Sequence, residues 1–270
     1  VRSLRIRRFR ECRPVAAGNA AHPHIDMPQI RQDTPPYNLP TARGSGATSR
    51  RDPHAPATHP SMPEAQNLAA RRGFAELFRD VGFRVKAGDA LVVTGPNGTG
   101  KTTLLRMLAG LSAPAAGEIR WHGRRVEPFS AELRAVVAYA GHLPALKDEL
   151  TAEENLVSLV ELSGTSAPRA DIDRALDAVA LSQRRSLPSR VLSAGQRRRI
   201  GLARLLVSRR PLWILDEPVT ALDAAGAALL ARLVHDHLDR GGIVVAATHQ
   251  SLGLEASRVQ SLVLGDTVPA

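Results

Sequence analysis

The chain has 270 residues, enough for one or two domains, and 43% of them are apolar, as in ordinary globular proteins. No apolar run approaches the roughly 20 residues that cross a bilayer, so the chain itself is not expected to span a membrane. The net charge of +10 could indicate nucleic-acid binding, but nearly all the cations are arginine, and alanine is also in excess. We attribute this bias to a GC-rich genome and expect no nucleic-acid partner.

Residues 1–61 are rich in proline and arginine and show no helical or strand period. Such a composition buries too little apolar surface to offset the entropy of ordering, so we expect a disordered extension. Three interpretations are open: a targeting peptide, a basic arm for anionic lipid or nucleic acid, or a translation start called too early, with Met62 as the true first residue. We favour the third. The only cysteine, Cys12, permits no internal disulfide, which fits a reducing compartment.

A phosphate-binding loop follows a buried-strand pattern at residues 90–94. The residues after it are Gly95, Pro96, Asn97, Gly98, Thr99, Gly100, Lys101, Thr102 and Thr103. All but the last fill the pattern G-x-x-x-x-G-K-[ST], in which backbone N–H groups cradle phosphates, the lysine lies beside the β and γ groups, and the hydroxyl reaches Mg²⁺. An amphipathic helix opens at Thr102 and points its N-terminal dipole at the anion. The loop therefore predicts binding of a nucleoside triphosphate.

The middle of the chain predicts short strands and a helical lobe. Residues 117–126 and 135–140 have the pattern of short strands beside the core sheet. Residues 151–154, Thr-Ala-Glu-Glu, have the form of a helix capping box, in which the first and last residues satisfy backbone N–H groups reciprocally. A second helical pattern starts at Asp171, with acidic residues in its first turn, where the helix dipole favours them. We therefore place a small helical lobe at about residues 151–192.

Two carboxylates end an apolar strand pattern at residues 211–218. Asp216 and Glu217 are expected at the carboxyl end of this strand, where ligands bind in nucleotide-binding α/β sheets. Asp216 is placed to hold Mg²⁺, because hard cations prefer oxygen ligands, and Glu217 to act as general base on the attacking water. Acids after an apolar run are often only a helix cap or a solvated turn, but the phosphate loop favours the catalytic interpretation. A later strand pattern at residues 243–248 delivers His249.

Residues 192–196 are Leu-Ser-Ala-Gly-Gln and precede an arginine-rich helix with an apolar stripe. Together with the phosphate loop and the acidic strand, this segment makes the chain resemble the ATP-binding subunit of an ABC transporter. The family signature is Leu-Ser-Gly-Gly-Gln, so Ala194 replaces its first glycine. The resemblance extends over about residues 70–264. It implies an α/β P-loop cassette in residues 62–270, with a mixed β-sheet core flanked by helices, that hydrolyses ATP with Mg²⁺.

The resemblance also implies a head-to-tail homodimer in which each ATP lies between two cassettes. Ser193, Gly195 and Gln196 of one subunit would face the phosphate loop of the other, and they lie at a helix N-terminus, which suits an anion. His249 resembles the switch histidine that lies near the γ-phosphate in this family and supports the general base. Residues 221–223 resemble the loop that touches the partner cassette.

Two positions depart from the family pattern. The usual lid glutamine is replaced by His142, which can still hydrogen-bond a water or ligate Mg²⁺. The position of the aromatic residue that stacks on adenine falls near Arg72, with Phe74 close by, and a guanidinium plane can also stack on a base. The sequence does not choose between these two residues, and Phe74 as a plain core residue is an equal alternative.

The loop with Gly141-His142, the strand Leu-Trp-Ile-Leu-Asp-Glu-Pro and the ending Thr248-His249-Gln250 resemble the cassette of the cytochrome c maturation haem-export system. That resemblance implies a peripheral ATPase at the cytoplasmic face of the bacterial inner membrane, docked on integral membrane permease subunits. ATP would power haem export or the release of a haem–chaperone adduct. The alternative is the ATPase subunit of another exporter, for a lipid, drug or peptide. Tandem cassettes that act on ribosomes and DNA-repair ATPases fit less well, because the chain has one cassette and no coiled coil.

Overall fold

The computed structural model describes residues 63–265. The chain divides into two units, residues 1–55 and 56–270, and all the structure reported below belongs to the second unit. The extension predicted at residues 1–61 and the start proposed at Met62 lie outside the described residues.

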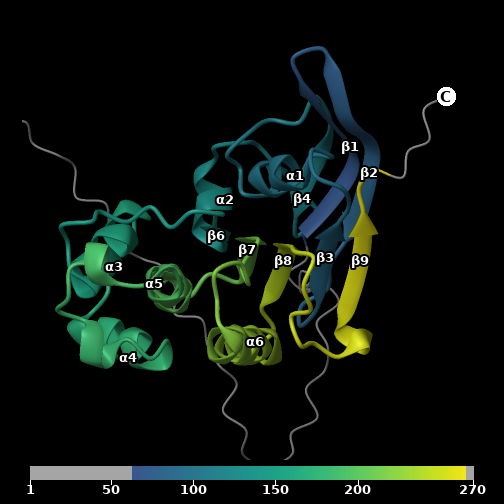
Figure 1. The fold of residues 1–270 in the computed structure, drawn as a ribbon. Helices are drawn as coiled ribbons and strands as arrows, with labels where there is room; N and C mark the ends of the chain where they lie inside the picture. Colours follow the sequence, from purple (N-terminus) through teal and green to yellow (C-terminus); the bar gives the residue numbers. More distant parts are fainter. Residues whose placement is uncertain (1–62, 266–270) are drawn as a thin grey trace, which may run out of the picture. The chain divides into compact units, whose positions relative to one another are not determined.

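Five parallel strands form the central sheet, in the order β6-β7-β8-β3-β9 (Figure 1). They are β3 (Ala90–Thr94), β6 (Val137–Ala140), β7 (Leu212–Asp216), β8 (Ile243–Ala247) and β9 (Val259–Val263), the last of which follows a short 3₁₀ turn, η3 (Ala256–Arg258). Every residue of β7 and β8 is buried, because both faces of the sheet are covered, and this accounts for their nearly unbroken apolar sequences. Because all five strands are parallel, their carboxyl ends meet at one edge of the sheet.

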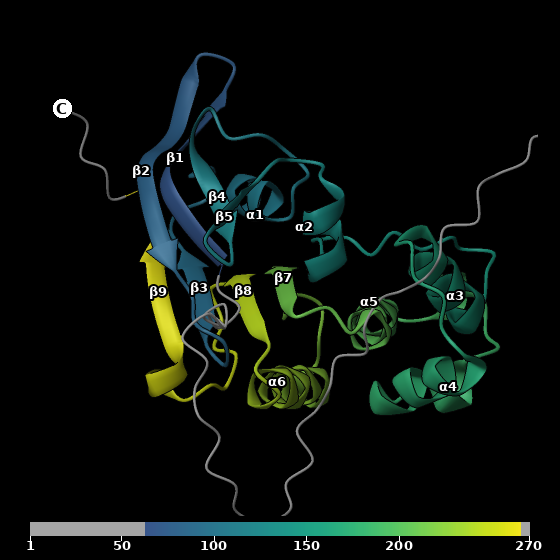
Figure 2. The same ribbon diagram turned by 180° about the vertical axis from the view of Figure 1, so that it is seen from behind.

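Two helices cover opposite faces of this sheet, α1 (Lys101–Leu108) and α6 (Ala224–Asp239) (Figure 2). The alternation along β7 shows the arrangement, since neighbouring side chains of a strand point to opposite faces. Leu212 and Ile214 pack in the apolar cluster that contains α1. Trp213 and Leu215 pack in the other cluster, which contains α6.

A second, antiparallel sheet packs against α1 from the side away from the central sheet, in the order β2-β1-β4-β5. Its strands are β1 (Pro63–Arg72), β2 (Ala75–Arg84), β4 (Ala116–Trp121) and β5 (Arg124–Val126). The segment predicted as strand at residues 117–126 is therefore a hairpin of this sheet. The segment predicted at residues 135–140 begins inside helix α2 (Ala131–Val136) and becomes strand β6 only at Val137. The mixed sheet expected from the sequence is thus built as two sheets that enclose α1.

Three further helices pack on one another beyond β6: α3 (Ala152–Leu162), α4 (Arg169–Ala178) and α5 (Ala194–Ser208) (Figure 1). The 3₁₀ turns η1 (Ser182–Arg184) and η2 (Ser189–Val191) lead from α4 into α5. The predicted capping box is confirmed: the Thr151 hydroxyl accepts from the Glu154 N–H at 3.2 Å, and the Glu154 carboxylate accepts from the Thr151 N–H at 2.8 Å. The second predicted helix begins at Arg169, two residues before its first acidic turn residue.

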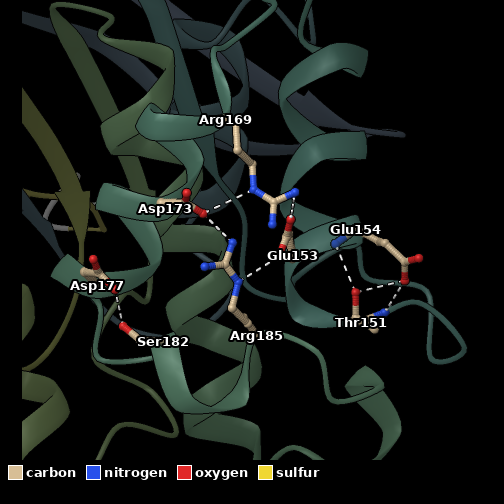
Figure 3. Close-up of polar contacts among 8 residues, drawn as sticks. All are labelled: Thr151, Glu153, Glu154, Arg169, Asp173, Asp177, Ser182 and Arg185. Atoms are coloured by element: carbon tan, nitrogen blue, oxygen red, sulfur yellow. Dashed lines mark hydrogen bonds and ion pairs between the residues drawn. The ribbon is translucent and has the colours of Figure 1, made fainter.

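A ring of alternating charges joins α3 to α4 and η1 (Figure 3). Glu153 accepts from Arg185 at 2.8 Å and lies 2.5 Å from the Arg169 guanidinium. Both arginines also reach Asp173, with 3.3 Å between the Arg169 Nε and the carboxylate. The hydrogen bond from Arg185 holds the pKa of Asp173 below its usual range. These partly exposed pairs hold the helices together, but each adds little stability, because ion pairs near the surface are screened by solvent.

One partly buried histidine lies beneath the central sheet. The His237 ring of α6 stacks on Trp213 of β7, with ring centroids 3.9 Å apart and planes 9° from parallel. Its Nε2–H donates to the Pro211 carbonyl at 3.1 Å, so the neutral tautomer with a proton on Nε2 fits this contact. Burial lowers the pKa of His237 to about 4.

The lowered pKa of His237 makes the stability of the fold dependent on pH. The ordinary pKa of histidine is 6.5, so this side chain is protonated below pH 6.5 in the unfolded chain. In the folded chain it becomes protonated only near pH 4. Stability from this group is present above pH 6.5 and is lost on acidification. Between pH 7 and pH 4.5 the free energy of unfolding should fall by about 2 kcal/mol more for the wild type than for His237→Gln. Urea unfolding at both pH values measures this, and equal losses would contradict the assignment.

Candidate functional site

The phosphate loop (residues 95–102) joins β3 to α1 and turns at three glycines with left-handed backbone. Their φ angles are 134° at Gly95, 89° at Gly98 and 99° at Gly100, a region that favours glycine. A Cβ at Gly95 would lie 2.1 Å from the Leu264 carbonyl oxygen, and one at Gly100 would lie 2.9 Å from the Phe78 ring. A Cβ at Gly98 would meet nothing within 4 Å. Glycine is therefore needed at the two ends of the loop by contacts within the chain, and at its tip by backbone conformation alone.

The predicted cation is held inside this loop. Lys101 is buried, and its ammonium donates to the Gly95 carbonyl at 2.7 Å and to the Pro96 carbonyl at 3.0 Å. The Thr99 hydroxyl donates to the Pro96 carbonyl at 3.0 Å, which tightens the same turn, while Asn97 is exposed at its tip. Helix α1 has no acidic residue in its first turn and no side-chain cap, so its first N–H groups are not neutralised by the chain's own side chains. This end of α1 suits an anion.

The second predicted oxygen donor lies directly beside the loop. The Thr102 hydroxyl donates to Asp216 Oδ1 at 3.2 Å, although 114 positions separate the two residues. Asp216 is the last residue of β7 and is 2% exposed. Thr103, the next residue of α1, is partly buried and makes no hydrogen bond through its hydroxyl among residues 63–265. The two residues predicted to hold a metal are therefore adjacent.

The other Asp216 oxygen has a partner that the sequence did not single out. The Tyr139 hydroxyl, at the end of β6, lies 3.4 Å from Asp216 Oδ2. Burial, and after it the negative charge of Asp216, raises the pKa of Tyr139 above its ordinary value, so the phenol stays protonated and can donate. A signal was present in the sequence, because Tyr139 ends a strand pattern just before the loop that holds His142.

Glu217 and His249 are brought together as predicted. The carboxylate Oε1 and the imidazole Nε2 lie 4.0 Å apart, and both side chains are partly open to solvent. Glu217 has a φ of 49°, which is uncommon for a residue with a side chain. Its N–H donates to the carbonyl of Ala247, the last residue of β8, at 2.9 Å. The turn after β7 therefore aims Glu217 toward the segment after β8.

Arg198 is the second site residue that sequence reasoning missed. It lies on α5, is 6% exposed, and donates to four backbone carbonyls: Gly141 at 2.8 Å, His142 at 2.6 Å, Asp216 at 2.8 Å and Glu217 at 2.7 Å. Burial lowers the pKa of its guanidinium, while the nearby carboxylates of Asp216 and Glu217 oppose that shift. The signal in the sequence was an arginine on the apolar stripe of a helix, four positions before the buried Leu202.

The signature residues begin α5, which we call the signature helix. Ser193 is its N-cap, and it forms a capping box with Gln196: the Gln196 N–H donates to Ser193 Oγ at 3.2 Å, and the Gln196 side chain accepts from the Ser193 N–H at 3.0 Å. A Cβ at Gly195 would lie 2.9 Å from the Ala221 carbonyl oxygen. Ala194 is exposed. Within residues 63–265, no hydrogen bond joins the signature to the phosphate loop of the same chain.

Three candidate nucleotide contacts stay apart from this cluster. The His142 side chain is exposed, and only its carbonyl is engaged, by Arg198. Phe74 lies fully exposed in the turn between β1 and β2, so its interpretation as a core residue is wrong: a turn at Gly73 carries it away from both sheets. Arg72, the last residue of β1, is also exposed and pairs with Ala75 across the hairpin.

The comparisons with known proteins decide the family. The model of the ABC transporter family matches residues 78–220. The chain belongs to the ABC transporter family. The predicted cassette fold and the predicted class of ATP-hydrolysing transport subunit are confirmed by this membership. None of the helices between residues 63 and 265 has the length and apolar character needed to cross a membrane.

Similar proteins within the ABC family show to which group of that family the chain belongs. The chain is 46% identical over 204 residues to the cytochrome c biogenesis ATP-binding export protein CcmA of Dechloromonas aromatica, covering 76% of this chain and 100% of the relative. It is 47% identical over 197 residues to the CcmA protein of Pseudomonas aeruginosa, covering 73% of this chain and 97% of the relative. At these identities the chain belongs with the cytochrome c biogenesis ATP-binding export proteins.

Solved structures agree with the fold. A putative ABC transporter ATP-binding protein from Pyrococcus furiosus matches with a TM-score of 0.65 at 22% identity, over 76% of this chain and 98% of that chain. The dimeric structure of an ATP-binding cassette in a post-hydrolysis state, bound to ADP and Pi, matches with a TM-score of 0.62 at 24% identity, over 70% of this chain and 88% of that chain.

Two of the loop glycines, Gly95 and Gly98, should respond differently to alanine. Gly95→Ala places a methyl group against the Leu264 carbonyl and should cost about 3 kcal/mol of unfolding free energy, because overpacking adds to backbone strain. Gly98→Ala meets no neighbour and should cost only about 1 kcal/mol, the strain of its positive φ. Thermal and urea unfolding of both variants measure the difference. Equal losses would show that the Leu264 contact does not fix this end of the loop.

Proposed function

We propose that this chain is the ATP-hydrolysing subunit of an ABC transporter complex that serves c-type cytochrome biogenesis by powering haem export or the release of a haem–chaperone adduct. The proposal rests on relatives named for cytochrome c biogenesis export, which this chain matches over 95–100% of their length at 46–47% identity. The convergence of the phosphate loop, Asp216, Glu217 and His249 at one edge of the central sheet supports the hydrolytic part.

The phosphate loop is proposed to bind the triphosphate of ATP. Backbone N–H groups of residues 97–103 would surround the phosphates, and Lys101 would exchange its two carbonyl partners for phosphate oxygens. The uncapped N-terminus of α1 adds a favourable dipole. His142 is proposed to meet the nucleotide only after the lid loop (residues 141–150) moves, because its side chain now faces solvent.

Thr102 and Asp216 are proposed to hold Mg²⁺. Their oxygens lie 3.2 Å apart, and hydroxyl and carboxylate are the donors that this ion prefers. Residues 63–265 contain no group of three histidine, cysteine or acidic side chains that could hold a metal, which fits an ion that completes its shell with phosphate and water oxygens. When bound, Mg²⁺ neutralises charge that develops on the transferred phosphoryl group.

Glu217 is proposed as the general base and His249 as the residue that supports it. The carboxylate would accept a proton from the attacking water, and the imidazole, 4.0 Å away, would orient the carboxylate or the water. Ser193, Gly195 and Gln196 are proposed to complete the site from a second copy of this chain. This fits their place at the N-terminus of α5, away from their own phosphate loop.

The integral membrane subunits are proposed to dock beside the lid loop and hold the chain at the cytoplasmic face of the inner membrane. Leu143 of this loop is 78% exposed. It borders a cavity of about 230 Å³ whose lining includes Pro144, Leu159 and Leu202. The apolar end of a helix from a membrane subunit fits such a surface, because a large exposed side chain beside an apolar hollow is typical of a contact site.

Glu217→Gln should separate binding from hydrolysis. The variant keeps the loop, Lys101 and the metal ligands, so it should bind ATP with about wild-type affinity and accumulate as an ATP-bound dimer, while kcat falls by about 10²–10³-fold. Nucleotide binding, sedimentation and phosphate release measure these three quantities. Lys101→Ala is the control that should lose most of the binding instead. Hydrolysis by Glu217→Gln at the wild-type rate would show that Glu217 is not the base.

The same variant tests the cargo. In cells whose only copy of the protein carries Glu217→Gln, a haem stain of c-type cytochromes should show loss of attached haem while the apocytochromes are still made. Wild-type haem attachment would exclude the role in cytochrome biogenesis and leave an ABC ATPase with another cargo.

Leu143→Glu tests the docking surface. A carboxylate at this position should weaken membrane association roughly tenfold or more, because it replaces an apolar anchor by a charge. Fractionation of cells into membrane and soluble protein measures the shift, with unchanged ATP binding as the check on folding. Leu162→Glu is the matched control, since Leu162 is 85% exposed at the end of α3 and does not line the cavity. An equal response from both variants would contradict the assignment.

A further inference from the structure

The outer edge of the central sheet is closed by arginines instead of a strand. Among the strands of residues 63–265, β7 is the only neighbour of β6 in the sheet, so the carbonyls on the other side of β6 need partners. The backbone carbonyls of alternate residues accept hydrogen bonds from arginines. Arg198 and Arg204 of α5 donate to Gly141 at 2.8 Å and to Tyr139, respectively. Arg210, just after α5, donates to Val137 at 2.7 Å. The alternation is that of a strand edge, and the guanidinium groups replace the N–H groups of a missing strand.

Arg198 differs from Arg204 and Arg210, the other two arginines at this edge of the sheet. One terminal nitrogen donates to Gly141 and His142 at the start of the lid loop, and the other donates to Asp216 and Glu217 at the end of β7. A planar guanidinium with two forked nitrogens can serve two segments at once, which a lysine ammonium cannot do from a single nitrogen. Arg198 therefore fixes the distance between the lid loop and the acidic turn.

The contact to Glu217 restrains an unusual backbone. Glu217 has a left-handed φ of 49°, and such conformations persist only where the surroundings hold them. The Glu217 N–H is held by the Ala247 carbonyl at 2.9 Å, and its carbonyl is held by Arg198 at 2.7 Å. With both flanking peptide groups held, the direction in which the Cβ of Glu217 leaves the backbone is held as well, and the carboxylate Oε1 lies 4.0 Å from the His249 Nε2.

We propose that Arg198 is a positioning residue for ATP hydrolysis, which holds the acidic turn at Asp216–Glu217 and the start of the lid loop in one arrangement on the signature helix. The inference rests on the proposed role of Glu217. Arg198 makes no hydrogen bond to the phosphate loop among residues 63–265, so it acts on the orientation of the base and not on the grip on the nucleotide. A displacement of Gly141 or His142 reaches Glu217 through one rigid guanidinium plane.

The test compares Arg198→Lys with Arg210→Lys in the full chain. Both variants keep a positive charge and lose a fork that donates to buried carbonyls, but Arg210 serves Val137 and Ser163, away from the acidic turn. For Arg198→Lys, kcat per folded protein should fall about 10–100-fold while KM for ATP stays within about twofold, because a misplaced catalytic group lowers the rate and not the binding. For Arg210→Lys, kcat and KM should both stay within about twofold, although the melting temperature falls.

Chemical rescue provides the second measurement. In Arg198→Ala, guanidinium added well below denaturing concentrations should restore part of kcat, whereas methylammonium at the same concentration should not, because only guanidinium presents two forked nitrogens. A variant that melts earlier but keeps wild-type kcat in its folded fraction would overturn the proposal. So would failure of both Arg198 variants to fold while Arg210→Lys folds, because Arg198 would then be a purely structural residue.

A parallel assay of Glu217→Gln separates the two assignments. If Glu217→Gln hydrolyses ATP normally while Arg198→Lys does not, the role of Glu217 fails, and the positioning by Arg198 then concerns another group of the acidic turn. If Glu217→Gln is inactive and Arg198→Lys has wild-type kcat, the base assignment stands and the Arg198 proposal is wrong.

Discussion

The parallel direction of the central strands is the constraint on which the site depends. Because β3, β6, β7 and β8 all run the same way, the loops after their carboxyl ends emerge at one edge. This edge brings the phosphate loop, Tyr139, Asp216 and His249 together, although they come from four separate segments of the chain. The contact between Thr102 and Asp216 across 114 positions is a direct result. Ligands bind beyond the carboxyl ends of the strands in α/β sheets, where the last strand residues and the loops that follow them line one crevice.

The second feature is the use of buried or partly buried arginines to satisfy backbone carbonyls. Arg198, Arg204 and Arg210 all have their pKa lowered by burial, so the fold accepts a desolvation cost at each of them. That cost is offset where each guanidinium makes charge-assisted hydrogen bonds to carbonyls that no strand would otherwise satisfy. The arginine content that raises the net charge of the chain is therefore in part structural, and at Arg198 it reaches the acidic turn.

The signature helix joins the central sheet to the helical lobe formed by α3 and α4. Its first residues form a capping box, its buried stripe packs against α3 and α4, and its Arg198 and Arg204 donate to carbonyls at the edge of the central sheet. The charge ring of Glu153, Arg169, Asp173 and Arg185 fixes the lobe on which this helix rests (Figure 3). A helix with contacts on both sides can pass a change in the lobe to the turn that carries Glu217.

The sequence by itself determined the features whose chemistry lies in consecutive residues. The phosphate loop, the acidic end of β7 and the capping box at Thr151 are local patterns, because turn conformation and helix capping depend on neighbours along the chain. Tertiary structure alone decided the division into two sheets, the exposure of Phe74 and the roles of Tyr139 and Arg198. These depend on contacts between distant segments: 77 positions separate Tyr139 from Asp216, and 57 separate Arg198 from Gly141. The sequence does not show which carbonyl or carboxylate folding will place beside a given hydroxyl or guanidinium group.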